Sequence, residues 1–412
     1  MDKNVEIVHR EYYNNIAMFE TTLKEFSKYP KDFEKLYKEK LAKKDTIVFD
    51  FKINNFPAFL HFNNDLFNLV FEVNNKNNEL NNIYKSLPGI ASSQYIRNSL
   101  VIDVKNTNEI EQVFSSRKEI FELAEDFKKR KSDKIGSIVS KYLMLLDNEN
   151  IKKNLSVEEI RRIYDQMFSG EFTLIDEKDK PDGVLFRKGS VGVYQEGVEE
   201  PVHSGVTPEE EIIRILNIGI DLLNNKNVNI FIRIAAFHYL FEYVHPFYDG
   251  NGRVGRYISS MLIKQNLSEI FAFRISAILK NNLSRYYKLF EDTEHIKNRG
   301  DITTFVYGFL ELMNKGYDDC IEYAKSKKQL LLDLLRSFKE KHKNLNSNVY
   351  KVIDVLYQAS VFSDFGVTVK TIASTINVSE KTVRRALDEC KKHVELVENK
   401  HGKFAYYEIK LN

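Results

Sequence analysis

Apolar residues recur three and four positions apart along most of the chain, which is the spacing of helices with one buried face. Residues 9–42 show this pattern, and it returns from about 107 to 147. Residues 46–52 predict a short strand, while the asparagine-rich stretch 74–82 predicts a turn or an interdomain linker. The dominant period therefore predicts a mainly α-helical protein.

Two helix starts carry side chains that cap a helix. Ser156 followed by Glu159 forms a capping-box pattern. Thr207 takes the N-cap position of the second start, with Pro208 at the first helical position and Glu210 completing the box. We expect this second helix to continue to about residue 224.

The next helical stretch, at about 228–243, is apolar on most of its faces, which predicts a helix at the centre of a domain. Residues 181–205 differ from the rest of the chain. They combine glycine and proline with alternating apolar positions such as Val191 and Val193, and they predict a β-hairpin. We interpret His203, near the end of this stretch, as a loop histidine without a role in a site.

The loop HPFYDGNGRVGR, which follows the buried helix, has the composition of an anion site. Pro246 ends the first helix, because the residue before a proline is pushed out of the helical region. Gly250 and Gly252 let a ligand approach the backbone closely, and the next helix begins there with N–H groups directed at the loop. Arg253 and Arg256 add two guanidinium groups on one helix face, so the loop is a predicted phosphate site.

Two reactive groups flank this phosphate site. Asp249 is a carboxylate suited to Mg²⁺, which takes one or two carboxylates together with phosphate oxygens. His245 lies across the loop and can act as a general base near neutral pH. A base, a metal ligand, an anion site and two arginines form the set needed to transfer a phosphate-linked group to a hydroxyl.

Other interpretations of these residues fit less well. Gly250, Gly252 and Gly255 match the dinucleotide-binding fingerprint, but that fingerprint follows a strand, and a helix precedes this loop. A purely structural turn does not need two arginines, a histidine and an aspartate. His238 and Glu242 have a spacing that suits a metal, but no third ligand is evident, so we interpret them as packed or solvated side chains.

The loop resembles the Fic motif, His-x-Phe-x-Asp/Glu-Gly-Asn-Gly/Lys-Arg-x-x-Arg, and fills every defining position. The resemblance implies an all-helical core with a β-hairpin flap, and transfer of AMP from ATP to Ser, Thr or Tyr hydroxyls of proteins. Gly252 stands where related kinases have lysine, which favours adenylylation. Phosphocholine transferases of the family bind their nucleotide reversed.

The same resemblance implies a role for each residue of the motif. His245 would deprotonate the target hydroxyl, and Asp249 would hold Mg²⁺ on the α- and β-phosphates of ATP. Phe247 would point inward as an anchor. The phosphates would be bound by the anion hole and by two arginines, which are Gly250, Asn251 and Gly252, and Arg253 and Arg256.

The flap of this family docks the target segment as an added strand, through main-chain hydrogen bonds. The resemblance places the flap at about 184–194, with Val191, Gly192 and Val193 along it. The alternative is an ordinary surface hairpin.

Many Fic proteins also carry an inhibitory helix with the pattern Ser/Thr-x-x-x-Glu-Gly/Asn. Thr107 and Glu111 match it, although Gln112 replaces the final small residue, and this places the inhibitory helix near 107–117. We expect Glu111 to pair with Arg256 in a two-point salt bridge and to occupy the place of the γ-phosphate. The alternative is a solvated glutamate on a polar helix.

The C-terminal part has the pattern of a separate module. Residues 316–345 predict one long charged helix that ends in a polar break. Residues 369–376 and a second helix capped by Ser379 predict a helix-turn-helix, and two strands around His401 predict a wing. Residues 346–412 therefore resemble a winged-helix domain.

The second helix of this module carries Lys381, Arg384 and Arg385 among acidic residues. Basic side chains on such a helix are the contacts that DNA phosphates need, but the acidic neighbours weaken the signal. DNA binding and a role in protein interaction, including homodimerisation, both stay open.

Composition narrows the setting. Lys+Arg 61 against Asp+Glu 59 leaves a net charge of +2, which argues against coating nucleic acid or a membrane by bulk charge. The polar N-terminus has no apolar signal core, and no apolar run approaches the roughly 20 residues of a membrane span. We therefore expect a cytoplasmic protein with no membrane partner.

These patterns divide the chain into a mostly helical region, a Fic domain, a helical linker and a winged helix, at 1–105, 106–315, 316–345 and 346–412. The leading hypothesis is a protein adenylyltransferase that uses ATP and Mg²⁺ and is autoinhibited by Glu111. One alternative is a non-catalytic, nucleotide-sensing regulator that binds DNA. Another is a bifunctional enzyme that also removes AMP. Intact His245 and Asp249 favour an enzyme.

Overall fold

The computed structural model describes residues 30–126, 135–149, 154–169, 180–193, 203–401 and 404–411. These parts of the chain are mainly helical, as the apolar spacing predicts. The portion of the first predicted helix before residue 30 lies outside the described residues. No helix in the described ranges combines the length and the apolar character that crossing a bilayer requires.

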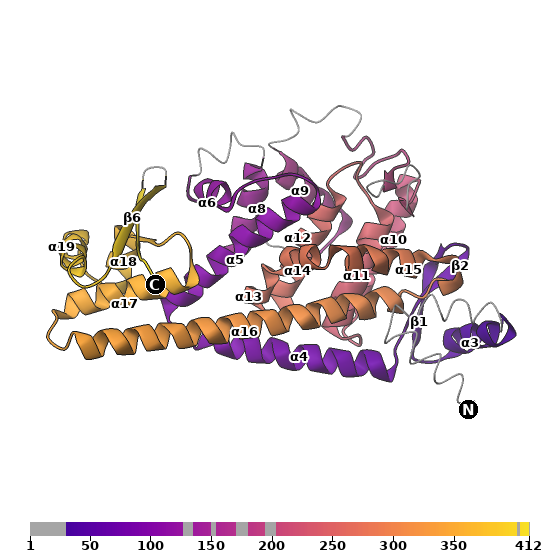
Figure 1. Cartoon of the computed structure of the whole chain (residues 1–412). Coiled ribbons are helices and arrows are strands. Elements are labelled where there is room, and N and C mark those ends of the chain that lie inside the picture. Colours follow the sequence, from indigo (N-terminus) through magenta and orange to yellow (C-terminus); the bar gives the residue numbers. More distant parts are fainter. Residues whose placement is uncertain are drawn as a thin grey trace.

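A long helix, α16 (Thr303–Lys341), runs along the molecule beside α4 (Asn64–Lys85) (Figure 1). The predicted turn or linker at 74–82 is wrong, because these residues lie inside α4. Asparagine is a poor helix former, but Asn77 is buried and accepts a hydrogen bond of 3.0 Å from the Tyr317 hydroxyl of α16. Packing against α16 thus overrides the local preference.

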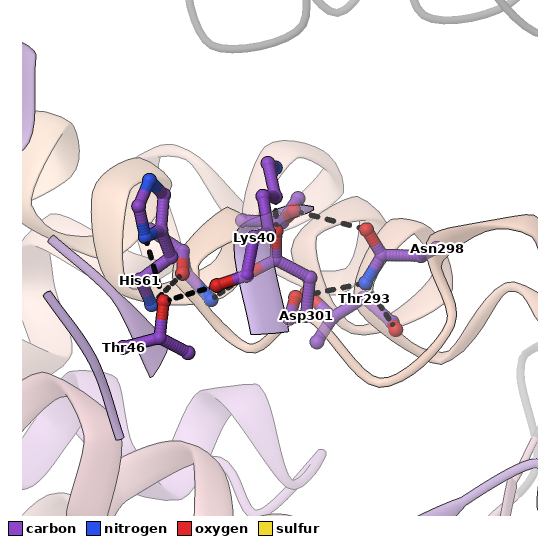
Figure 2. A network of polar contacts seen from close by, with 8 residues as sticks. Lys40, Thr46, His61, Thr293, Asn298 and Asp301 are labelled. Atoms are coloured by element: carbon purple, nitrogen blue, oxygen red, sulfur yellow. Dashed lines mark hydrogen bonds and ion pairs between the residues drawn. The ribbon is translucent and has the colours of Figure 1, made fainter. Parts of the chain in front are cut away.

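The N-terminal hairpin lies at one end of α16 (Figure 1). It consists of β1 (Thr46–Ile53) and β2 (Phe56–His61), follows α3 (Pro30–Ala42), and confirms the strand predicted at 46–52. Its attachment is a polar network with the turn before α16 (Figure 2). Lys40 Nζ donates to Asp301 Oδ2 at 2.9 Å, and the amide of Phe59 donates to the carbonyl of Gly300 at 2.9 Å.

The core is built around α11 (Ile230–Val244), which packs against α10 (Glu209–Asn224), α12 (Asn251–Asn266) and α16. Nearly all of its side chains are buried. This confirms the prediction of a central helix that is apolar on most faces. Because α12 follows α11 after only a short loop, the ends of two buried helices meet at the loop 245–250.

The predicted helical stretch at 107–147 is divided in the structure. Helix α5 (Gly89–Ile110) ends there, and after a break come α6 (Arg117–Glu125) and α8 (Gly136–Leu146). Helix α5 also runs without a break across residue 105, and α16 runs across residue 315. The remaining elements of this part are α9 (Val157–Phe168), α13 (Glu269–Ala272), α14 (Ile275–Asn281), α15 (Leu283–Glu294) and the 3-10 turn η2 (Ile296–Asn298).

One of the two predicted helix starts is confirmed. Ser156 caps α9, since its hydroxyl accepts from the amide of Glu159 at 3.2 Å. The predicted cap at Thr207 is wrong: α10 begins at Glu209, and its N-cap is Pro208, with no side-chain hydrogen bond. The carboxylate of Glu209, the first residue of this helix, accepts from the amides of residues 184, 185 and 186 at 3.0, 2.7 and 2.8 Å.

The hairpin predicted within 181–205 is present but short. Strand β3 (Gly192–Val193) pairs antiparallel with β4 (His203–Ser204), and the residues between them lie outside the described ranges. Residues 181–190 form no regular strand. They are held instead by the contacts with Glu209 and by others described below.

The C-terminal module lies at the other end of α16 (Figure 1). Its elements follow the predicted order, including a second helix capped by Ser379, whose hydroxyl accepts from the amide of Thr382 at 3.1 Å. Phe365 stacks on Phe121 of α6 at 3.9 Å. The elements are α17 (Ser347–Phe362), β5 (Val367–Thr368), α18 (Val369–Ile376), α19 (Glu380–Cys390), β6 (Leu396–His401) and β7 (Phe404–Ile409), with strand order β5-β7-β6.

Candidate active site

The loop between α11 and α12 has a fixed shape. His245 ends α11 in the left-handed conformation (φ 51°, ψ 63°), so the chain turns there as Pro246 predicts. The side chain of Asn251 closes the loop, since Oδ1 accepts from the amide of Phe247 at 2.9 Å and Nδ2 donates to its carbonyl at 2.8 Å. Phe247 is fully buried and stacks on Tyr164 at 3.8 Å, so it points inward as expected.

The start of α12 presents backbone donors to this loop. Gly250 is its N-cap, and the first helical hydrogen bond runs from the amide of Val254 to the carbonyl of Gly250 at 3.1 Å. The amides of Asn251, Gly252 and Arg253 therefore precede that bond, and groups in this position attract anions. Because the Asn251 side chain is engaged in the loop, it is the backbone of this residue that faces an anion.

The two predicted phosphate-binding arginines are both almost fully buried in α12. Nη2 of Arg253 lies 3.3 Å from Asp249 Oδ2, and its guanidinium lies 4.5 Å from the centre of the Phe168 ring. Arg256 turns to α5 instead: its Nε donates to the Thr107 hydroxyl at 2.9 Å, and its Nη2 donates to the Thr107 carbonyl at 3.0 Å.

Glu111 forms the predicted ion pair with Arg256. Its Oε1 accepts from Nη2 at 2.7 Å, and its side chain is 27% exposed against 2% for the arginine. The expected two-point geometry is wrong, because Thr107 takes part of the guanidinium and one oxygen of Glu111 makes the contact. Burial alone would raise the pKa of Glu111, but the charge and hydrogen bond of Arg256 hold this pKa below its usual value.

The Glu111 carboxylate lies directly against the first turn of α12. A Cβ atom on Gly252 would come within 2.3 Å of Glu111 Oε1, so only glycine allows this approach. The space beside the backbone donors of α12 thus already holds a negative charge. A lysine at position 252 would not fit with Glu111 in place.

His245 has the properties of a base. Its Nδ1 lies 3.3 Å from the carbonyl of Glu242, and because a carbonyl only accepts, this contact assigns the proton to Nδ1 and leaves Nε2 as the acceptor. Burial lowers the pKa of His245 to about 4, and the positive charges of His203 and Arg187 act in the same direction. The imidazole is therefore neutral at neutral pH.

Asp249 is the exposed carboxylate of the loop, with 59% of its side chain accessible. Its Oδ1 accepts from the amide of Gly250 at 2.7 Å, which directs the group toward the start of α12. In the part of the chain that the structure describes, no group of three or more His, Cys, Asp or Glu could hold a metal ion.

A buried polar chain behind α12 was not predicted. The hydroxyl of Tyr286 lies 2.8 Å from His238 Nε2, His238 Nδ1 lies 2.9 Å from the Ser259 hydroxyl, and that hydroxyl donates to the carbonyl of Gly255. This series of hydrogen bonds supports the first turns of α12 from the side opposite the loop. His238 is therefore a packed side chain, as expected, and the available signal was a polar residue on a helix otherwise apolar on all faces. Burial also raises the pKa of Glu242, beside Gly255, to about 8.

The structure thus brings the predicted motif residues, Glu111 and the flap to one place. Val191, Gly192 and Val193 follow each other at β3, and the carbonyl of Val191 accepts from the amide of Gly205 at 2.9 Å. Sequence analysis missed Arg187, which is fully buried, and assigned no role to His203. Both contact the end of α11, as described below.

Comparison with known proteins agrees with this geometry. Residues 154–263 match the model of the Fic/DOC family, so this part of the chain is similar to a Fic domain. A protein of Aquifex aeolicus (strain VF5), named "Probable protein adenylyltransferase", is 43% identical over 53 residues. That match covers 13% of this chain and 17% of the relative.

Two solved structures are similar to this chain. The crystal structure of a Fic family protein from Desulfovibrio desulfuricans G20 covers 85% of this chain and 97% of its own, with a TM-score of 0.51 and 15% identity. Fic-1 of C. elegans covers 63% of this chain and 73% of its own, with a TM-score of 0.45 and 18% identity. The first of these likenesses supports the Fic fold over most of the chain.

Proposed function

We propose that this protein is a Fic-type adenylyltransferase that moves AMP from ATP to a Ser, Thr or Tyr hydroxyl of a protein target. The observation that carries the proposal is the neutral imidazole of His245 beside the backbone donors and arginines at the start of α12. The name of the Aquifex aeolicus relative supports the same reaction class.

In the proposed reaction, the target oxygen forms a bond to the α-phosphorus, and the bond from that phosphorus to the bridging oxygen of pyrophosphate breaks. His245 Nε2 takes the hydroxyl proton as the new bond forms. The amides of residues 251–253 and the guanidinium of Arg253 stabilise the phosphate oxygens.

Asp249 is the residue that fits Mg²⁺. Its exposed carboxylate stands next to the anion site, and Mg²⁺ bound with nucleotides takes one or two carboxylates, phosphate oxygens and water. The ion would neutralise phosphate charge when bound.

Glu111 restrains this reaction. A γ-phosphate near Arg256 would meet the Glu111 carboxylate, and two negative groups compete for the same guanidinium. ATP then binds without the grip of Arg256, and transfer is slow. Whether Glu111 also promotes removal of AMP is a separate alternative.

The test is incubation of the purified chain with Mg²⁺ and, one at a time, ATP, GTP, CTP, UTP and CDP-choline, followed by intact-mass measurement. Glu111→Gly is the active form, and Glu111→Gly/His245→Ala is its matched control. An added AMP that requires ATP and His245 supports the proposal. Labelling by another nucleotide, or labelling that persists in the double variant, would contradict it.

DNA binding and homodimerisation through the C-terminal module stay predictions from the sequence. The exposed residues of α19 include Lys381, Arg384 and Arg385, but Arg384 lies 3.3 Å from the carboxylate of Glu380 on the same helix. The face carries both signs of charge and does not favour DNA over a protein partner.

A further inference from the structure

The segment before β3 contains a buried arginine, Arg187, that contacts the C-terminal end of α11. The Arg187 side chain donates to four backbone carbonyls. Nε reaches the carbonyl of His245 at 2.7 Å, and Nη2 reaches those of Val206 at 2.8 Å and Val244 at 3.2 Å. Nη1 bonds to the carbonyl of Gly189. Burial lowers the pKa of Arg187 to about 10, so it remains charged at neutral pH.

His203, on β4, makes a second connection to the same helix end. Its Nε2 lies 2.7 Å from the carbonyl of Tyr243, and its Nδ1 lies 2.7 Å from Glu294 Oε2 on α15. A carbonyl and a carboxylate both accept hydrogen bonds, so the doubly protonated ring satisfies both contacts. His203 and Glu294 are 14% and 18% exposed, so the pair is largely shielded from water.

Both cations therefore bind the end of α11, where the last carbonyls lack partners within the helix. This end also carries the negative pole of the helix dipole, which favours nearby positive charge. The three carbonyls bound there belong to Tyr243, Val244 and His245. The last of these is the residue held in the left-handed conformation.

Backbone hydrogen bonds also join the segments that carry the two cations to the end of α11. The amide of Val206 donates to the carbonyl of Val244 at 3.0 Å, and the amide of Arg187 donates to that of Pro246 at 3.2 Å. A Cβ atom on Gly205 would lie 2.3 Å from Arg187 Nη2 and 3.0 Å from His245 Cβ. Because residue 205 is glycine, the backbone that follows β4 lies close to both Arg187 and His245.

We propose that Arg187 and His203 are positioning residues, which fix the conformation of His245 and the place of the flap strand relative to it. The proposal rests on the proposed function only in naming His245 as the base and the flap as the docking strand. By holding both, the two cations set the distance between the base and any hydroxyl presented by a strand docked on β3.

The cations also act on the base through their charge. Burial is the main cause of the lowered pKa of His245, and each cation lowers this pKa further. Loss of either charge would therefore disturb the geometry of the base and raise its pKa.

The contacts that Arg187 and His203 make with the end of α11 depend on pH through His203. Burial alone would lower the pKa of His203, but Glu294 and the carbonyl of Tyr243 outweigh it, and the pKa is raised. Arg187 opposes that rise from the segment before β3, and the other titratable groups beside this ring are His245, Glu242 and Tyr243 at the end of α11. A raised histidine pKa means that the contact is fully present below about pH 6.5 and is lost as pH rises through the folded value.

The kinetic test uses Glu111→Gly as the active parent and adds Arg187→Met. We expect the maximal rate of self-modification to fall, on the order of ten- to a hundredfold, as a misplaced reacting group does. The ATP concentration at half-maximal rate should stay unchanged, because Arg187 contacts no residue of α12 among its hydrogen bonds. Arg187→Lys keeps the charge and should recover part of the rate.

Arg233→Met is the matched control. Arg233 also donates to a backbone carbonyl, that of Leu223, but it lies at the opposite end of α11. We expect the parent rate in this control. A maximal rate in Arg187→Met equal to that of the parent, or a change confined to the ATP dependence, would overturn the proposal.

A second measurement does not require transfer activity. NMR titration of the His245 imidazole in Arg187→Met should show its pKa raised toward the ordinary value, and hydrogen exchange should quicken at the amides of Gly205 and Val206. If the parent transfers nothing, the proposed function fails, while this measurement still decides whether Arg187 positions His245 and the flap strand. Unchanged titration and exchange would refute the positioning role.

His203→Gln is the milder variant and tests the pH dependence. The parent should lose activity as pH rises through the pKa of His203. His203→Gln should lack this descending limb of the pH–rate profile. Glu294→Gln should move the limb to lower pH, because it removes the partner that raises the pKa. An identical limb in all three proteins would exclude the His203 contact from function, even if Arg187→Met did not fold.

Discussion

The two sides of the active site are stabilised by opposite arrangements of charge. On the phosphate side, the acid Glu111 lies on the cation Arg256. On the flap side, the cations Arg187 and His203 lie on neutral backbone carbonyls. In the proposed function a phosphate competes with Glu111 for the same guanidinium, whereas Arg187 is fully buried and its carbonyl partners belong to the fold itself. We therefore expect a ligand to open the phosphate side, while the flap side stays fixed.

The backbone that carries Glu111 is firmly attached to the rest of the fold. Glu111 follows helix α5, and the buried carboxylate of Asp103 on α5 accepts from the amide of Ser276 on α14 at 2.8 Å and from the Ser276 hydroxyl at 3.1 Å. The contacts of Arg256 with Thr107 do not involve Glu111. We therefore expect release of Glu111 to require rotation of one side chain and no movement of the helix.

The largest expected effect is loss of the base, which stops transfer while leaving both sides of the site intact. His245→Ala should reduce self-modification by on the order of 10²–10⁴-fold, the usual contribution of a general base. ATP affinity, measured by calorimetry on the same sample, should be largely retained because the anion site lies on α12. Full activity in this variant would remove His245 from the mechanism.

The next effect concerns the phosphate side alone. A charge-assisted hydrogen bond contributes roughly 1.5–3 kcal/mol, so Glu111→Gly should raise transfer by about ten- to a hundredfold at ~1.4 kcal/mol per decade. Glu111→Gln should be partly released. Glu109→Gln is the control, since Glu109, in the last turn of α5, pairs with Lys105 and Lys280 and not with Arg256. Equal rates for wild type and Glu111→Gly would show a glutamate without an inhibitory role.

A smaller effect is expected for the second partner of Arg256. Thr107→Val has a similar shape but leaves the buried Nε of Arg256 without its acceptor. The free energy of unfolding should fall by ~1–3 kcal/mol, the cost of an unsatisfied buried donor, as measured by urea denaturation. Thr107→Ser keeps the hydroxyl and should restore most of the loss. A Val variant as stable as wild type would mean that water replaces this contact.

The smallest expected effect separates the two sides by pH. The pKa of Glu111 is lowered, so its pair with Arg256 persists at neutral pH and is lost only as pH falls through a value below the usual one of about 4.3. The ratio of Glu111→Gly to wild-type rates should therefore stay constant from about pH 6 to 8. Both proteins should share the decline caused by His203. A ratio that changes across this window would mean that Glu111, or Glu242, which is coupled to it, titrates there.

The difference between the two sides also appears in what the sequence predicted. On the phosphate side the sequence predicted that the groups lie together, because they belong to one short motif, with Pro246, two glycines and two arginines between two apolar helices. Arg187 was missed, because its partners are backbone carbonyls, and a carbonyl leaves no signature in a sequence. The contact of Glu209 with amides of a distant segment was missed for the same reason.

The sequence by itself determined the helical class, the central helix, the Fic motif and the elements of the C-terminal module, because spacing and capping are local properties of the chain. The tertiary structure decided that 74–82 is helical, that Glu111 lies on Gly252 with one oxygen on Arg256, and that His203 contacts the end of α11. These outcomes depend on groups far apart in the chain. Burial places them together, and the removal of water makes each buried charge and carbonyl require a partner.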